Sequence, residues 1–247
     1  MRIIISENAG ELGKSAAQHT AEVLRSAISK KGKARMVLST GQSQFETLES
    51  LLEQDIDWNR VEVFHLDEYI GLPESHPASF RKYLNERFVS KIKLSAFYPV
   101  NGEGDVMDRI EELNRLISSE PVDIGLIGIG ENAHIAFNDP PADFEEKSPY
   151  IIVKLDSRCR EQQVREGWFP DTGSVPEKAV SMSVQQILKC GCIISSVPHQ
   201  VKARAVKLTL ESEITPDVPA SILKTHGSYH LYLDTGSASE IMRGIKI

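Results

Sequence analysis

A histidine with acidic and amide neighbours follows the most apolar stretch of the sequence. Residues 122–129 read VDIGLIGI, which is typical of a strand buried on both faces, and His134 and Asp139 come shortly after it. An imidazole can act as a general acid and base when a nearby carboxylate fixes its tautomer. The stretch therefore indicates a catalytic histidine, although a strand followed by an ordinary loop histidine fits it equally well.

Two adjacent carboxylates, Asp67 and Glu68, follow a second predicted strand at residues 61–66. The carboxyl ends of parallel strands form the edge at which open α/β sheets bind ligands. Neighbouring acids raise each other's pKa, which suits a base that must hold and return a proton. The alternative is a helix N-cap with a solvated charge beside it, and the pair alone does not separate the two.

A short polar loop links the predicted strand at residues 34–38 to the next helix. Its candidate ligand-binding residues are Thr40, Gly41, Gln42 and Ser43. A helix N-terminus offers free backbone N–H groups and the positive end of the helix dipole, and glycine and hydroxyl groups favour close approach of a phosphate. The loop lacks the Gly-Lys-Ser/Thr ending of a P-loop. Ser43 could instead be a simple N-cap with Glu46 as its capping-box partner.

Cations occur in two further segments that could contact an anionic ligand. Lys202 lies near the start of a predicted helix, where a positive charge is unfavourable for the helix and is better explained by a bound anion. Residues 156–175 combine arginines, aromatic residues and glycines, as a lid over an anion could. The residues concerned are Arg158, Arg160, Arg165 and Trp168. A plain surface helix and loop is an equally good interpretation of this segment.

The surrounding elements alternate between strand and helix. We predict strands at residues 2–6, 34–38, 61–66, 97–100, 122–129, 151–155, 193–197 and 229–233. We predict helices at residues 10–30, 45–52, 77–89, 105–118, 178–189 and about 198–211. Because no repeat or linker divides the chain, this alternation predicts one domain over residues 1–247, with a lid-like segment at about 156–175. The expected fold is α/β, a three-layer α/β/α sandwich with a mainly parallel, Rossmann-like sheet.

Composition limits the kinds of partner. The chain has 247 residues and a formal net charge of −7, from 28 basic and 35 acidic residues, and no basic block, so a nucleic-acid partner is not expected. No apolar run is long enough to span a membrane. Three cysteines do not form a disulfide framework, which favours a reducing cytoplasm. Cys190 and Cys192 are expected to be structural, because no second cysteine or histidine cluster completes a metal site with them.

Four stretches, in order and over nearly the whole chain, resemble the glucosamine-6-phosphate deaminase/isomerase family. Residues 39–43 (STGQS) are similar to its phosphate loop, and residues 65–72 (HLDEYIGL) to its most specific signature. Residues 128–138 (GIGENAHIAFN) resemble its catalytic loop, whose Ile-Ala-Phe-Asn end differs from that of the related 6-phosphogluconolactonases. Residues 198–203 (PHQVKA) resemble the segment whose lysine binds the substrate phosphate.

The resemblance implies an enzyme of amino-sugar metabolism that converts glucosamine 6-phosphate and water to fructose 6-phosphate and ammonia. Its partner would be a small-molecule sugar phosphate, without a metal or other cofactor, and the chain could form a homo-oligomer. Other activities stay open. They are deamination or isomerisation of another hexose phosphate such as galactosamine 6-phosphate, lactone hydrolysis of the 6-phosphogluconolactonase type, and sugar-phosphate sensing without turnover.

The resemblance also assigns roles to single residues. Asp67 would move a proton from C2 to C1, and His134 would move a proton at the ring oxygen, supported by Asp139 and Asn132. The phosphate would bind the loop residues 40–43 together with Lys202 and a lid arginine. Counting along the lid from residue 155 favours Arg165 over Arg158 and Arg160.

Two positions depart from the family pattern. Asp139 stands where glutamate is usual, and Asn132 where some members have aspartate. Aspartate is shorter than glutamate by one methylene, ~1.3–1.5 Å, so its hydrogen bond to the histidine would be out of range unless the backbone lies closer. The shorter acid could mark a site adapted to another sugar epimer.

Overall fold

The computed structural model describes residues 1–241, which form one large and one small sheet with surrounding helices. The strands are β1 (Arg2–Ser6), β2 (Ala34–Leu38), β3 (Val61–His65), β4 (Asp67–Tyr69), β5 (Ala96–Tyr98), β6 (Ile124–Leu126), β7 (Tyr150–Lys154), β8 (Lys178–Met182), β9 (Cys192–Val197) and β10 (Tyr229–Asp234). The α-helices are α1 (Ala9–Lys31), α2 (Phe45–Leu52), α3 (Phe80–Arg87), α4 (Val106–Ser118), α5 (Ser157–Arg165), α6 (Val184–Leu188) and α7 (Ala203–Glu211). Short 3₁₀ helices are η1 (Gln42–Gln44), η2 (Trp58–Arg60), η3 (Val89–Lys91), η4 (Gln200–Lys202) and η5 (Pro219–Thr225).

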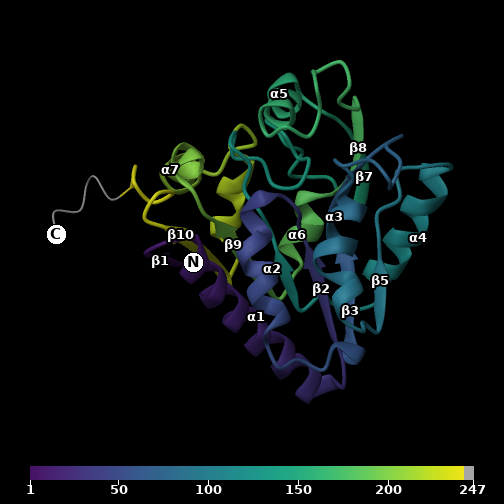
Figure 1. The fold of residues 1–247 in the computed structure, drawn as a ribbon, viewed down its shortest axis with the longest axis vertical. Coiled ribbons are helices and arrows are strands. Elements are labelled where there is room, and N and C mark those ends of the chain that lie inside the picture. Colours follow the sequence, from purple (N-terminus) through teal and green to yellow (C-terminus); the bar gives the residue numbers. More distant parts are fainter. Residues whose placement is uncertain (242–247) are drawn as a thin grey trace.

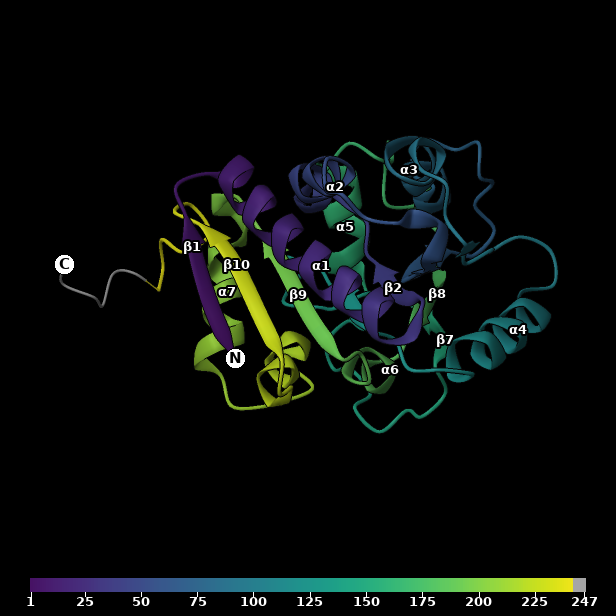
Figure 2. The same cartoon turned by 90° about the horizontal axis from the view of Figure 1, so that it is seen from below.

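The large sheet has seven strands in the order β1-β10-β9-β6-β2-β3-β5, and all of its neighbouring strands are parallel. Helices α1, α2 and α3 pack on one face, and α4, α6 and α7 pack on the other (Figures 1 and 2). This arrangement confirms the predicted three-layer α/β/α sandwich with a mainly parallel, Rossmann-like sheet.

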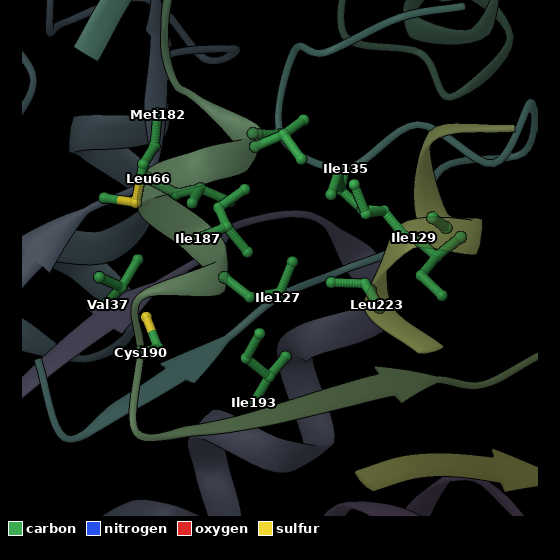
Figure 3. Packing of buried hydrophobic residues seen from close by; sticks show 14 of the residues in the cluster. Val37, Leu66, Ile127, Ile129, Ile135, Met182, Ile187, Cys190, Ile193 and Leu223 are labelled. Carbon is green, nitrogen blue, oxygen red and sulfur yellow. The ribbon is translucent and has the colours of Figure 1, made fainter. Parts of the chain in front are cut away.

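The alternation of side chains along each strand produces two separate cores. In β2, Val37 contributes to the core beneath α4 and α6, whereas Met36 and Leu38 contribute to the core beneath α1 and α2. Figure 3 shows the first of these cores, where Ile127 and Ile193 from the sheet lie near Ile187 of α6. Because strand β6 is buried on both faces, it lies within a continuous apolar run. Strand β2 is also buried on both faces, but Arg35 interrupts its apolar sequence and pairs with Glu62 at 3.0 Å.

Helix α1 illustrates how the sequence sets the ends of an element. Its N-cap, Asn8, accepts a hydrogen bond from the Glu11 N–H at 3.0 Å. At its end, Gly32 adopts a φ of 81° and donates its N–H to the Ile28 carbonyl at 2.8 Å. Alanines form much of its buried side, which lets the helix approach the sheet closely. Within residues 1–241, no helix combines the length and apolarity needed to cross a membrane.

The predicted helix at residues 178–189 is wrong over its first half. Residues 178–182 form β8, which pairs antiparallel with β4 and β7 in a second, three-stranded sheet, and only Val184–Leu188 is helical. The segment KAVSM buries Ala179, Val180 and Met182, and its backbone groups bond to strands that lie far away in the sequence. Ser183 then caps α6 by accepting a hydrogen bond from the Gln186 N–H at 3.2 Å.

Candidate active site

The strand order brings four loops to one edge of the large sheet. The segments after β9, β6, β2 and β3 are neighbours there, because these strands are adjacent in that order. They enclose a cavity of about 460 Å³, which α5 covers from the lid-like segment. Among the residues that line it are Thr40, Gly41, Gln42, Ser43, Asp67, His134, Arg165 and Lys202. Of the residues that the sequence placed in catalysis and phosphate binding, Asn132 and Asp139 do not line the cavity, but both contact His134, which does.

Asn132 and Asp139 support His134 from behind. Asp139 Oδ1 lies 3.0 Å from His134 Nδ1, so the shorter acid does reach the imidazole. The two atoms are poorly aligned for a hydrogen bond, which is common in ligand-free active sites. Asn132 donates from Nδ2 to Asp139 Oδ1 at 3.2 Å and accepts from the His134 N–H at 3.2 Å. Burial raises the pKa of Asp139, but its contacts with His134 and Asn132 outweigh this effect and hold the pKa below 3.8.

The loop between β6 and Asp139 has an unusual backbone that fixes the His134 ring. Ala133 and Ala136 adopt φ angles of 64° and 50°, which non-glycine residues rarely do. A β-carbon at Gly130 would lie 2.2 Å from His134 Nε2, so the imidazole occupies space that only glycine leaves free. The Gly130 N–H also donates to the His134 carbonyl at 2.9 Å. Strain of this kind is typical of functional loops.

Asp67 and Glu68 have different environments although they are adjacent. Asp67 faces the cavity and is 5% exposed, and burial together with the nearby Glu68 charge raises its pKa well above 3.8. Glu68 is fully buried and accepts hydrogen bonds from the Ser79 hydroxyl at 2.9 Å and from the Arg81 N–H at 2.9 Å, at the start of α3. The alternative of a helix N-cap with a solvated charge is therefore wrong, because both residues are buried in β4 and the N-cap of α3 is Ser79. Glu68 accepts hydrogen bonds at the start of α3, and Asp67 remains available to a ligand.

The loop after β2 is shaped to leave its backbone open. Gly41 has a φ of 104°, and no atom lies within 4 Å of the place where a β-carbon would be. Its carbonyl accepts a hydrogen bond from the Tyr83 hydroxyl at 2.9 Å. Ser43 does not cap α2; its hydroxyl accepts from Gln44 Nε2 at 3.1 Å, and Gln44 also donates to the Ser196 carbonyl at 3.2 Å. Gln44 thus ties this loop to the end of β9.

Two cations approach the same loop from other directions. Lys202 follows β9, and burial lowers its pKa while the charges of Glu166 and Glu131 act in the opposite direction. Arg165 is the last residue of α5, and its Nη2 lies 2.8 Å from Glu131 Oε2. The arginine is 57% exposed, so this ion pair is screened by solvent. A dianionic phosphate at this place would compete with Glu131 for Arg165.

Other residues of the lid and its surroundings differ in their access to the cavity. Arg158 and Arg160 do not line it, and Arg160 instead donates to the Thr172 carbonyl. Trp168 does line it and donates from Nε1 to Glu166 at 3.2 Å. His65 is buried away from the cavity, and burial and the Arg81 charge lower its pKa to about 3. No role for His65 in proton transfer follows from this position.

Sequence reasoning missed three contributors to this site. Glu131 pairs with Arg165, Tyr83 holds Gly41, and the Cys159 thiol lies beside His134 and Asp139. Burial raises the pKa of Cys159, so the thiol stays protonated beside the carboxylate. Each contact joins segments that are distant in the sequence. Of the three residues, only Glu131 could have been recognised, because it lies in the loop that also contains His134.

In two groups of side chains within residues 1–241, three potential metal-ligand atoms lie within 4.8 Å of one another. One consists of His134, Asp139 and Cys159, beside the cavity. The other consists of His19, Cys192 and His230, at the opposite edge of the sheet. The expectation that no histidine cluster accompanies Cys190 and Cys192 is therefore wrong for Cys192.

The family model for glucosamine-6-phosphate isomerases/6-phosphogluconolactonase matches residues 7–231. The glucosamine-6-phosphate deaminase of Streptococcus suis is 34% identical over 206 residues, covering 83% of this chain and 86% of the relative. That of Lactobacillus delbrueckii subsp. bulgaricus is 30% identical over 245 residues, covering 97% and 99%.

Solved structures agree with the family match. A monomeric glucosamine-6-phosphate deaminase superposes with a TM-score of 0.88 at 32% identity, covering 97% of this chain and 99% of that one. The 6-phosphogluconolactonase of Thermotoga maritima shares the fold, with a TM-score of 0.78 at 16% identity and coverage of 94% and 99%. Family match and fold together show that the chain belongs to the glucosamine-6-phosphate isomerase/6-phosphogluconolactonase family.

Proposed function

We propose that this protein converts glucosamine 6-phosphate and water to fructose 6-phosphate and ammonia. The observation that carries the proposal is the arrangement around one cavity of a buried carboxylate, a supported imidazole and two cations, which are Asp67, His134, Arg165 and Lys202. A base, an acid and an anion site within one cavity are what an aldose–ketose isomerisation of a sugar phosphate requires. Relatives at 30–34% identity that are named glucosamine-6-phosphate deaminases support the same activity.

Phosphate binding comes first in the proposed mechanism. The phosphate would accept hydrogen bonds from the loop residues Thr40, Gly41, Gln42 and Ser43 and pair with Lys202 and Arg165. Gly41 leaves its backbone open, so the phosphate can approach closely. Holding C2 within reach of Asp67 in this way can lower the barrier by on the order of several kcal/mol.

Proton transfer at the sugar ring would follow. His134 gives a proton to the ring oxygen and takes the proton of the anomeric hydroxyl as the bond between C1 and the ring oxygen breaks, and Asp139 stabilises the imidazole in the tautomer that this requires. Asp67, in its ionised form, then takes the proton from C2 and delivers it to C1, while the oxygen on C1 gains a proton and the amine nitrogen loses one, which converts the aldose amine to a ketose imine. Between the two transfers Asp67 is a neutral carboxylic acid. Burial favours this form, because it raises the pKa of the carboxyl.

Hydrolysis completes the proposed reaction. Water adds to C2 of the imine, the C2–N bond breaks, and the nitrogen leaves as ammonia with the protons it has received. The products are the ketose, fructose 6-phosphate, and ammonia, so atoms and charges balance without an oxidant or reductant.

The test is ammonia release from the purified protein with glucosamine 6-phosphate, with galactosamine 6-phosphate in parallel. Ammonia and fructose 6-phosphate in equal amounts from the first substrate are the expected result. Ammonia from the second substrate alone would keep the mechanism and change the sugar. If neither substrate releases ammonia but 6-phosphogluconolactone is hydrolysed, the protein is a lactonase. If neither releases ammonia and sugar phosphate only raises the melting temperature, the protein is a sensor.

Oligomeric state belongs to the same proposal. The solved relative at 32% identity is described as monomeric, which favours a monomer over the homo-oligomer that the sequence allowed. Mass measurement by light scattering during gel filtration, with and without glucosamine 6-phosphate, distinguishes the two.

A further inference from the structure

We propose that His19, Cys192 and His230 form a binding site for a borderline or soft divalent metal ion such as Zn²⁺, at the edge of the sheet opposite to the active site. One candidate ligand atom from each of the three residues lies within 4.8 Å of the other two. This site is independent of the proposed function, and none of its residues lines the active-site cavity.

The fold explains why residues so far apart in sequence meet. His230 pairs in register with Ile194, and Cys192 lies two positions before Ile194, so both side chains point to the same face of the sheet. Helix α1 lies across β9 and β10 on that face and brings His19 to them (Figure 2). Cys190, by contrast, belongs to the core on the other face and cannot join the site.

In each of the two histidines, one ring nitrogen contacts a hydroxyl group of the protein. His19 Nδ1 lies 2.9 Å from the hydroxyl of Tyr232, and His230 Nε2 lies 3.3 Å from that of Ser228. Such contacts fix the ring orientation and leave the second ring nitrogen for the metal. The two rings meet edge to face with centroids 4.3 Å apart, so the two imidazoles are in direct contact.

The distances suit a tetrahedral ion. Bonds of about 2.0–2.3 Å to Zn²⁺ place ligand atoms roughly 3.3–3.8 Å apart, so donors within 4.8 Å need shifts of about 1 Å, which side-chain torsions supply. Two imidazoles and a thiolate select Zn²⁺, Co²⁺, Cd²⁺ or copper over Mg²⁺ and Ca²⁺, which prefer oxygen ligands. The fourth position would hold water.

Access and charge are also suitable. His19 and Cys192 line a surface hollow, which Glu22 of α1 also lines, so an ion can reach them from solvent. Glu22 lies one helical turn after His19 and offsets the positive charge of Arg2, which pairs in register with His230. A bound ion would connect α1 to β9 and β10 and so stabilise the packing of the first helix on the sheet.

The experiment is a titration of EDTA-treated, full-length protein with Co²⁺, followed by the near-ultraviolet charge-transfer band of a cobalt–thiolate bond. We expect one equivalent to bind with this band, Zn²⁺ to displace it, and Zn²⁺ to raise the melting temperature. Cys192→Ser should abolish the band, and His19→Gln and His230→Gln should each weaken binding by about 10-fold or more. Circular dichroism of the metal-free variants checks that they are folded.

Two cysteine variants serve as matched controls. Cys159→Ser removes the thiol of the group beside the active site, and Cys190→Ser removes the neighbouring thiol on the other face of the sheet. Both should keep the band and the affinity of the wild type. Absence of the band at millimolar Co²⁺, its survival in Cys192→Ser, or its loss in Cys159→Ser would each overturn the proposal. None of these measurements depends on the enzymatic activity of the protein.

Discussion

Asp139 brings a carboxylate oxygen to 3.0 Å from Nδ1 of His134, although its side chain is one methylene shorter than that of a glutamate. The backbone therefore makes up the difference that the sequence alone left open. Asn132 and the Asp156 N–H, at 3.2 and 3.4 Å, also contact this carboxylate and hold it in place. Because these contacts fix the carboxylate, a longer side chain would have to displace it or the imidazole.

Replacing Asp139 with glutamate is accordingly expected to lower activity. Because the extra methylene displaces either the imidazole or the carboxylate by roughly 1 Å, kcat for ammonia release should fall by about 10- to 100-fold. KM should change little, since the phosphate contacts are elsewhere. Steady-state kinetics of Asp139→Glu beside Asp139→Asn measure this, and a Glu variant as active as the wild type would contradict it.

Gly130 should be essential for the position of the His134 ring. In Gly130→Ala the new β-carbon would lie 2.2 Å from Nε2, so the ring must rotate away, and kcat should fall by about 100-fold or more. The ring is the free end of a side chain, so the protein should still fold. Gly128→Ala is the matched control, because its β-carbon meets its first neighbour at 3.4 Å, and its kcat should stay within about threefold of the wild type.

Asp67→Asn should abolish the exchange of the C2 proton with solvent while leaving substrate binding nearly intact. The amide is isosteric but cannot take up a proton, so kcat should fall by about 100- to 10,000-fold. Loss of deuterium from C2-labelled glucosamine 6-phosphate, followed by NMR, reports the step directly. Undiminished exchange in the variant would assign the base to another residue.

The same substitution should change how stability depends on pH. Since burial raises the pKa of Asp67 above 3.8, the wild type loses stability as pH rises from 3.8 through the raised pKa, because the unfolded chain ionises first. Asp67→Asn lacks this loss, so its unfolding free energy should rise relative to the wild type over that window.

Asp139→Asn is the control for this pH measurement, with the opposite sign. The pKa of Asp139 is lowered, so its contribution to stability is present above 3.8 and is lost as pH falls through the lowered pKa. Urea unfolding of the three proteins across pH gives both differences. Parallel curves for Asp67→Asn and the wild type would show that Asp67 titrates alike in the folded and unfolded chains.

Glu131 is expected to weaken phosphate binding by holding Arg165. A partly exposed ion pair contributes about 0.2–1 kcal/mol, so Glu131→Gln should lower KM for the sugar phosphate by roughly 1.5- to 5-fold. Lys202→Met should act in the opposite direction and raise KM steeply. Glu161→Gln, which removes an exposed acid of α5, is the control and should leave KM unchanged. A higher KM in Glu131→Gln would mean that Glu131 assists binding.

The helices and strands were predicted well wherever burial produced a clear pattern of apolar residues in the sequence. The apolar run before Gly128 and the alanine face of α1 both correspond to elements of the expected type. The helix expected from residue 178 failed because Lys178–Met182 is short and is stabilised as a strand only by β4 and β7. Propensity within one segment carries no information about such distant partners.

The candidate site was predictable to a similar degree. The polar groups after β2, β3, β6 and β9 could each be recognised from the sequence. The order of these strands in the sheet, which makes the groups neighbours, could not be predicted from the sequence pattern. The pairing of Arg165 with Glu131 and the approach of His19 to Cys192 depend on that order and on helix placement. Their roles in catalysis and metal binding stay predictions.

Strand β1 has a single neighbour in the large sheet, β10, and so residues 2–6 pair with residues 229–234, which are synthesised much later. The order of synthesis therefore differs from the order of assembly: residues 2–6 stay unpaired until residues 229–234 have emerged, whereas β2, β3 and β5 can already associate. A nascent chain stalled before Tyr229 would consequently lack two strands of the sheet rather than one. An unpaired β1 would therefore mark a chain in which residues 229–234 have not yet joined the sheet.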